Sequence, residues 1–529
     1  MSVLHRVRAR AATCVVAAAL VALPSAAGAQ QPAPTVVPTG PLTLDQVLDL
    51  AVGRSETVAI AQTGIRRAEG EQVRARSGLF PQISLSGGYD RALASEFSGL
   101  FDTVGGSDSP SSDSDLSDLP FGRANTWRLS LAFSQNIYSG GSVGLQRQLA
   151  TLGNETAMQG LTTARGQLLY DATQAYYDAA LADRLVAIAE ATVQQAGATL
   201  QQVQTGFEAG TQPEFEVLRA RVNRDNQQPV LIRQRLNREI ALLRMKQLLD
   251  LPADADLRLA DALGDELLPP PPVFVTRVAA IEQSLIDATR ETSVSAAIGR
   301  ATADRTVVAE AATSLQQRET ALRLTEAARK PAISLNSTFT RLAYPADDEF
   351  PKFDRMNWTV SANVQMPLFT GGRQRGDELV ARADVDESKL RLQQVKELAA
   401  LDTQSASTEL LAARAVWEAS SGTVQQATRA YEIADVRYRN GVSTQLELTD
   451  SRLLLQQAEA NRAVAARDLQ VARARVALLP DLPLSATAAA AARPITVPPP
   501  QAPSQQQQPS TGQLRTVSTQ GAQGQTGTR

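Results

Sequence analysis

The chain contains two related halves, and this internal duplication limits its possible folds more than any other feature. Residues 137–141 (Ile-Tyr-Ser-Gly-Gly) reappear 231 positions later as residues 368–372 (Leu-Phe-Thr-Gly-Gly). At the same offset, residues 207–210 (Phe-Glu-Ala-Gly) correspond to residues 438–441 (Tyr-Arg-Asn-Gly). A single offset that holds between distant motifs is the signature of repeated structural units. We therefore predict an internal two-fold repeat.

Each copy contains short segments in which apolar and polar residues alternate. The alternation runs through residues 127–137 in the first copy and residues 358–368 in the second, and the segments that begin at Ile83 and Ile333 alternate in the same way. A period of two residues is typical of a β-strand with one apolar and one polar face. The pattern predicts four strands per chain. It fits either a water-facing sheet packed on a core or a sheet in a membrane.

Aromatic residues at the strand ends favour the membrane interpretation. Trp127 and Tyr138 bracket one predicted strand, and Trp358 and Phe369 bracket the other. About eleven residues at ~3.3 Å each, tilted by ~40°, span roughly 27 Å, which is close to the ~25 Å apolar band of a transmembrane β-barrel. We therefore predict that these four residues form the aromatic girdle of such a barrel.

The pattern becomes helical after each pair of glycines. Residues 141–210 and 372–441 contain no proline and are rich in Ala, Gln, Leu, Arg and Glu. They predict two helices of about 100 Å, at 1.5 Å per residue. A second helix is expected after each Phe/Tyr-x-x-Gly turn, at about 215–249 and 446–478. Further helices are expected before the strands, over residues 43–76 and about 275–329. The first of them opens with a capping box formed by Thr43 and Gln46.

The first 29 residues have the features of a secretory signal peptide. Three arginines precede an apolar stretch from Ala11 to Leu23, and Ala27 to Ala29 form a small-residue cleavage site. A membrane anchor is the alternative, but the apolar stretch is too short to span a bilayer of about 30 Å. We expect an exported protein.

Cysteine and histidine usage then limits the chemistry. Cys14 and His5 are the only residues of their types, and both lie in the predicted signal peptide. A mature chain without them has no thiol nucleophile, disulfide, Ser-His-Asp triad or histidine metal ligand. A hydrolase with paired carboxylates remains the enzymatic alternative. The net charge of −3 argues against nucleic-acid binding. We predict no catalytic site, cofactor or metal.

The order of these elements, with Ser/Thr-Gly-Gly at each strand-to-helix junction, resembles the TolC-like outer membrane efflux channel family (outer membrane factors). The resemblance covers residues 41–483 and is most specific at the Phe/Tyr-x-x-Gly turns and at the junction glycines, which are Gly140, Gly141, Gly371 and Gly372. It implies an α+β membrane protein with a trimeric 12-stranded outer-membrane β-barrel, four strands per chain, continuous with a long periplasmic α-helical barrel. Independently, four strands cannot close on themselves, and open sheet edges do not persist in lipid.

The resemblance also implies roles for the residues at the helix tips. The turns at Phe207, Gly210, Tyr438 and Gly441 would form the periplasmic entrance and dock with an adaptor. The acidic residues just beyond the turns would narrow that entrance, and they are Glu216, Glu447 and Asp450. Solvated helix-start carboxylates are the alternative, because acidic side chains stabilise a helix N-terminus in any case.

The domain organisation follows from the repeats. We expect a signal peptide at 1–29, an N-terminal linker at 30–40, the first repeat at 41–252, a linker or equatorial region at 253–275, the second repeat at 276–483 and a disordered tail at 484–529. The strand-to-strand loop of the first repeat carries an acidic insert at 102–118, which we expect to be an extracellular loop, with calcium binding as the alternative.

The resemblance implies the outer membrane channel of a tripartite efflux or type I secretion system. Its partners would be two further copies of the chain, outer membrane lipid, a periplasmic adaptor (membrane fusion protein) and an inner membrane pump. The alternative is that the chain is itself a periplasmic coiled-coil adaptor. An adaptor needs one helical hairpin, whereas this sequence predicts two hairpins and four strands.

Overall fold

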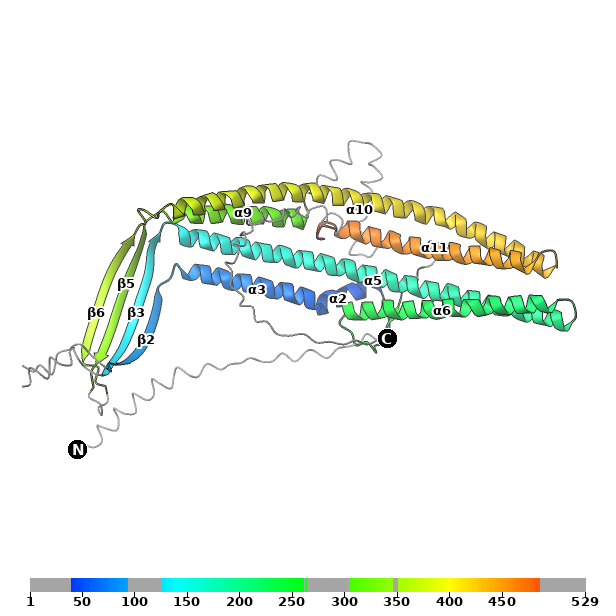
Figure 1. Ribbon diagram of the computed structural model, residues 1–529, viewed down its shortest axis with the longest axis horizontal. Coiled ribbons are helices and arrows are strands. Elements are labelled where there is room, and N and C mark those ends of the chain that lie inside the picture. The colour runs from blue at the N-terminus through cyan, green and yellow to red at the C-terminus, as the bar shows by residue number, and fades with distance from the viewer. Residues whose placement is uncertain are drawn as a thin grey trace, which may run out of the picture.

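The computed structural model describes residues 40–93, 125–260, 263, 302, 304–345 and 351–485. Nearly all of the predicted signal peptide, N-terminal linker, acidic insert and C-terminal tail lies outside these residues. The described part is elongated, with a β-sheet at one end and long helices running away from it (Figure 1). None of its helices combines the length and apolarity needed to cross a membrane.

The sheet has four antiparallel strands in the order β2-β3-β5-β6. The strands are β2 (Gln82–Arg91), β3 (Asn125–Ser139), β5 (Ala332–Ala343) and β6 (Arg355–Gln365). The first two come from the first half of the chain and the last two from the second half. The halves therefore meet at the β3–β5 pair, and β2 and β6 form the two edges. A separate parallel pair joins β1 (Pro41–Leu42) to β4 (Arg258–Leu259).

The register places the apolar residues of all four strands on one face. Leu131 is opposite Leu85 on one side and Phe339 on the other, and Phe339 is opposite Trp358. Directly opposed residues share a face, so the alternating pattern of each strand is in phase with its neighbours. The opposite face carries mostly Ser, Thr, Asn and Arg, beginning at Ser130 and its partners. This face is polar over most of the sheet, with Leu342, opposite Arg128, as an exception.

Two strands depart from the simple alternation. The β3–β5 register shifts between Asn136 and Tyr138, so Ile137 is the extra residue of a β-bulge and Tyr138 is opposite Ile333 on the apolar face. In the second half we expected alternation through residue 368, but β6 ends at Gln365. Pro367 explains the early end, because proline has no N–H to donate to a ladder.

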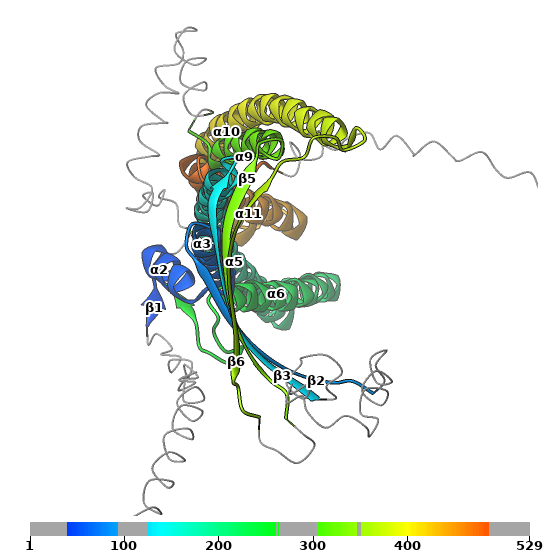
Figure 2. The same ribbon diagram turned by 90° about the vertical axis from the view of Figure 1, so that its left-hand side faces the viewer.

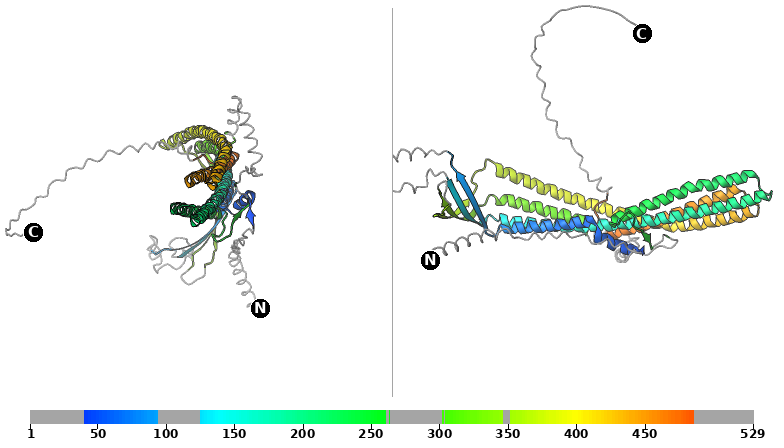
Figure 3. Two further views of the ribbon diagram at one scale, coloured as in Figure 1. Left: turned by 90° about the vertical axis from the view of Figure 1, so that its right-hand side faces the viewer. Right: turned by 90° about the horizontal axis from the view of Figure 1, so that it is seen from below.

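Two helical hairpins form the long part of the molecule. They are α5 (Ser142–Glu208) with α6 (Glu214–Leu248), and α10 (Arg373–Arg439) with α11 (Gln445–Leu478). The two long helices have 67 residues each, and α6 and α11 have 35 and 34. Viewed along their axes, the helices form a curved layer rather than a closed bundle (Figures 2 and 3).

Shorter helices lead into the strands. The predicted helix over 43–76 is divided into α2 (Leu44–Arg54) and α3 (Glu56–Ser77), because Ser55 leaves the helical conformation and its side chain caps α3. The capping box of Thr43 and Gln46 is confirmed. In the second half, α9 (Thr306–Ala327) precedes β5.

The main apolar core lies midway along the molecule, where the hairpins meet the shorter helices. Its most deeply buried side chains include Val47, Tyr176, Met245 and Leu469. At this level α11 ends where α9 begins, and the Thr306 amide donates to the carbonyl of Pro480 over 2.8 Å. The two helices therefore stack end to end, as Figure 1 shows.

Candidate functional site: the hairpin tips and the helix joint

Both hairpins turn through the same backbone geometry. Each long helix ends in a glycine with positive φ, +74° at Gly210 and +71° at Gly441. In the first turn the Thr211 amide donates to the Gly206 carbonyl, and in the second the Val442 amide donates to the Arg437 carbonyl. This is the Schellman motif, whose left-handed position is strained for a side chain that has a Cβ. The sequence prediction of glycine-dependent turns is thus met at both tips.

The two aromatic tip residues are in different environments. Phe207 is 46% exposed. Tyr438 of the second hairpin is half-buried and packs on an apolar cluster of the first hairpin. The cluster consists of Leu200, Val203, Val217 and Ala220. Tyr438 therefore fastens one tip to the other within a single chain, which sequence offsets alone do not reveal.

Of the three predicted entrance acids, two are neutralised by ion pairs and one is not. Glu216 forms an ion pair with Arg219 at 3.6 Å, and Glu447 forms one with Arg437 at 3.4 Å. Asp450 is exposed, and within the described part of the chain no cation lies within ion-pair distance of it. The net charge of the two tips together is therefore smaller than three free carboxylates would give.

Several polar groups at the tips are buried without hydrogen-bond partners among the described residues. They include the Glu216 Oε2, the Ser443 hydroxyl and both polar atoms of the Gln445 amide. Burial, with a smaller contribution from the charge of Glu216, raises the pKa of the Tyr438 hydroxyl. Unpaired buried groups are costly, so the polar groups at the tips are poorly satisfied within one chain.

The junction and girdle residues lie at the other end of the helices. Gly140, Gly141, Gly371 and Gly372 all have positive φ, between +61° and +90°. Trp127, Tyr138 and Trp358 lie on the apolar face of the sheet, as their cross-strand partners show. Phe369 lies beyond the end of β6 and is 91% exposed.

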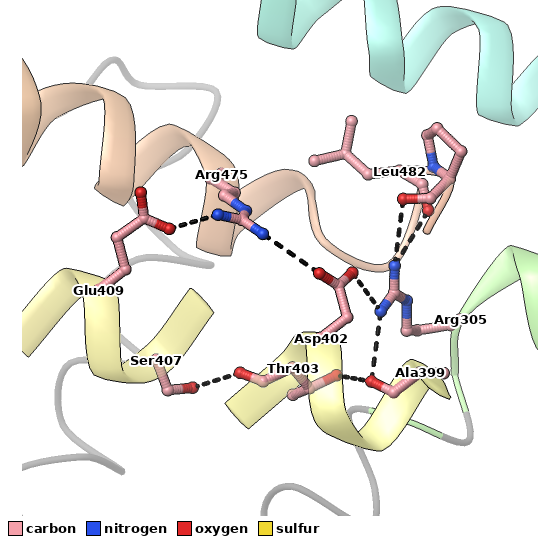
Figure 4. Close-up of polar contacts among 9 residues, drawn as sticks. Arg305, Ala399, Asp402, Thr403, Ser407, Glu409, Arg475 and Leu482 are labelled. Carbon is pink, nitrogen blue, oxygen red and sulfur yellow. Dashed lines mark hydrogen bonds and ion pairs between the residues drawn. The ribbon is translucent and has the colours of Figure 1, made fainter. Parts of the chain in front are cut away.

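A buried ionic network at the joint between α11 and α9 was missed by sequence reasoning. Arg305 is fully buried, and its guanidinium donates to Asp402 at 2.8 Å and to the carbonyls of Ala399 and Leu482 at 3.3 Å (Figure 4). Arg475 donates to the other oxygen of Asp402 at 3.1 Å and also pairs with Glu409. One carboxylate of α10 thus joins the start of α9 to the end of α11.

Electrostatics explains why Asp402 stays ionised there. Burial raises the pKa of Asp402, but hydrogen bonds from Ser485 and Arg305 and the charges of Arg305 and Arg475 lower it below the usual aspartate range. The signal in the sequence was weak, because Arg305 and Asp402 lie in different helices and no motif connects them. Only the fold brings them together.

A cavity of about 630 Å³ lies between α5 and α6. Asp171 and Asp178 line it, which is the kind of acidic pair that a hydrolase would need. Asp178, however, is paired with Arg467 of α11 at 2.6 Å, and Asp171 accepts a hydrogen bond from Gln167. Within the described residues no group of three or more acidic side chains is placed to hold a metal ion.

Comparison with known proteins identifies the family. The family model described as "Outer membrane efflux protein" matches residues 47–250 and 297–480. The chain belongs to the outer membrane efflux protein family. As a family member it is an outer membrane transport protein of the TolC-like type, and its long helices lie in the periplasm.

Solved structures agree with this assignment at the level of the fold. The chain is 16% identical to the CmeC outer membrane channel of Campylobacter jejuni, with a TM-score of 0.64, over 85% of this chain and 88% of that one. It is 17% identical to the outer membrane protein VceC of Vibrio cholerae, with a TM-score of 0.64, over 82% and 95%. It is 17% identical to the open-state MtrE outer membrane channel of Neisseria gonorrhoeae, with a TM-score of 0.62, over 84% of this chain and 89% of that one. No curated protein sequence matched the chain.

Proposed function

We propose that this outer membrane efflux protein is the passive exit duct of a tripartite efflux or type I secretion system. Three copies would close one 12-stranded barrel above one helical barrel. The observation that carries the proposal is the four-stranded sheet, which has one apolar face and two edges, β2 and β6, without partners in the described chain. Open edges leave backbone groups unpaired, which lipid does not tolerate.

The number three follows from barrel size. Two copies would give eight strands, and an eight-stranded barrel is filled by its own side chains. Three copies give twelve strands and leave a lumen lined by the polar face of the sheet. The apolar face, which carries Leu131 midway along β3 and Val360 midway along β6, would then face lipid.

The junction glycines give independent support for a neighbouring copy. A Cβ on Gly140 would lie 2.8 Å from the Ala327 carbonyl oxygen, so α9 packs tightly there. The corresponding Gly371 has nothing within 4 Å of the same position. If the repeats alternate around a ring, the end of α3 from the next copy would occupy this space.

A stripe of exposed apolar side chains on α6 also supports a neighbouring copy. Apolar side chains recur along it at intervals of three or four residues, with a longer interval around Pro229. They are Phe215, Leu218, Val222, Ile232, Leu236, Ile240 and Leu243. A regular stripe of this kind is typical of a helix that packs on another helix. A neighbouring copy in a helical barrel would cover it.

The test is the mass of the purified mature protein in mild detergent, measured by light scattering. We expect about three times the protomer mass, and loss of solubility when detergent is removed. A protein that stays monomeric in buffer without detergent would refute the duct and favour the adaptor alternative.

The tips would form the entrance and the adaptor contact. The Schellman turns present Phe207 and Val442 outward, and Phe207 is 46% and Val442 67% exposed. Pull-down by a purified periplasmic adaptor from the same organism would test the contact, with a Gly441→Val variant as the disrupted form. Equal capture of both forms would place docking elsewhere.

A further inference from the structure

The apolar face of the sheet carries two charged residues in its four described strands. Arg91 and Arg341 share this face, since Arg91 follows Tyr89 by two residues and Arg341 follows Phe339 by two. Both are cations, and both lie toward the strand ends farthest from the helices (Figure 1). Toward the helix end, the face presents Tyr138 and other uncharged residues. The charge on this face is therefore asymmetric between the two ends.

Arg341 is held in place by its surroundings. Its Nη1 donates to the Phe353 carbonyl oxygen over 2.8 Å, and its guanidinium carbon lies 6.0 Å from the ring centroid of Phe339. Its cross-strand partners on the same face are Leu129 and Met356. A guanidinium has five donors, so most remain available after the Phe353 contact. Asp354 follows Phe353 in the chain, and no ion pair joins it to Arg341.

The cost of placing a cation on this face depends on its depth in the membrane and on the anions that it meets. An arginine facing the lipid core costs about 2–4 kcal/mol at the midplane and far less near the interface. A long side chain near the interface extends its charged head toward the polar region. There it meets lipid headgroups, and arginine binds phosphate through two parallel hydrogen bonds.

We propose that Arg341 binds a phosphate of a phosphorylated lipid in the outer leaflet, with Arg91 adding positive charge at the same rim. This inference rests on the proposed function, because it requires the apolar face to contact lipid. The helix end of the face has no equivalent cation in the strands, so the site discriminates between the two leaflets. The ligand is the lipid headgroup and not free phosphate.

The experiment uses the purified full-length protein in mild detergent and native mass spectrometry. The probes are bisphosphorylated lipid A, its dephosphorylated form and phosphatidylcholine. We expect the wild type to prefer the bisphosphorylated lipid, and Arg341→Gln to raise its Kd about tenfold, which is about 1.4 kcal/mol. Arg341→Lys, which keeps the charge but loses the bidentate geometry, should fall between them.

The matched control is Arg128→Gln. Arg128 lies near the same end of the sheet but on the polar face, where it pairs with Asp90 at 3.2 Å. We expect its lipid binding to equal that of the wild type. Equal binding by Arg341→Gln and wild type would overturn the proposal, as would displacement of the lipid by excess inorganic phosphate.

The same spectra separate this inference from the proposed function. A trimer with no preference for phosphorylated lipid would refute the Arg341 site and leave the duct intact. A protein without a trimeric mass, or one in which Arg128→Gln loses lipid and Arg341→Gln does not, would refute the orientation of the sheet on which both depend.

Discussion

Replacing Arg305 by methionine should destabilise the joint between α9 and α11 more than any surface substitution. Arg305 is fully buried and donates to Asp402 and to backbone carbonyls on both sides of the joint. Methionine fills a similar volume but leaves Asp402 with Arg475 as its only arginine partner. Breaking a buried pair by removing one partner costs about 3–5 kcal/mol. Because Arg475 remains, we expect the lower end of that range.

The assay is urea unfolding followed by far-ultraviolet circular dichroism, in detergent and at constant protein concentration. The control is Arg391→Met on α10, whose partner Glu387 is also exposed. Exposed pairs of this spacing contribute about 0.3–0.5 kcal/mol. If both variants unfold at the same urea concentration, the joint does not limit stability and the reasoning is wrong.

The pH dependence gives a second test of the same network. The pKa of Asp402 is lower in the folded chain than the ordinary value. The carboxylate therefore contributes stability that is fully present above about pH 4 and is lost as the pH falls through the folded-state pKa. Asp402→Asn has no titrating group, so its unfolding midpoint should change less on acidification. Parallel pH profiles for wild type and Asp402→Asn would exclude Asp402 as the source.

Three further predictions concern the sheet, the turn and the entrance. If the apolar face contacts lipid as proposed, Leu131→Arg should impair membrane assembly by about 2–4 kcal/mol, whereas Ser130→Arg should assemble normally. The amount of trimer on gels reports the assembly of both variants, and equal assembly would mean that the faces are reversed. Gly441→Val should cost about 1–2 kcal/mol at the tip, since valine is strained at positive φ, and should increase protease cleavage near residue 441 without reducing barrel assembly. Single-channel recordings should show cation selectivity that Asp450→Asn abolishes, because nothing in the described chain pairs with Asp450. Arg437→Gln should increase this selectivity, because Arg437 neutralises Glu447. Unchanged selectivity in both variants would place the constriction elsewhere.

The periodic parts of the fold were predictable because local sequence specifies them. Alternation gave the four strands, and the glycines at 210 and 441 marked the ends of the long helices to within a few residues. The exceptions have local causes that periodicity does not detect. Ser55 competes with the backbone and divides one helix, and Pro367 ends β6 early.

The site was predictable only in its positions along the chain. The acids beyond each turn lie where expected, but their ion pairs depend on side chains across the turn, such as Arg437. Tyr438 packs on the other hairpin, and Arg305 meets Asp402 across 97 residues. Contacts of this kind depend on three-dimensional packing between elements, which no short sequence pattern encodes.

The end-to-end stacking of α11 on α9 has a mechanical consequence. Along α10 the chain runs unbroken from the strand junction to the tip, but alongside it the path is interrupted where Thr306 meets Pro480. A force applied at the tip would therefore bend α10 as one continuous helix and would tend to slide α11 past α9 at the break. The hydrogen bonds of the Arg305 guanidinium would oppose this sliding. A displacement of the tip would then be coupled to a small displacement between α9 and α11 at the middle of the molecule.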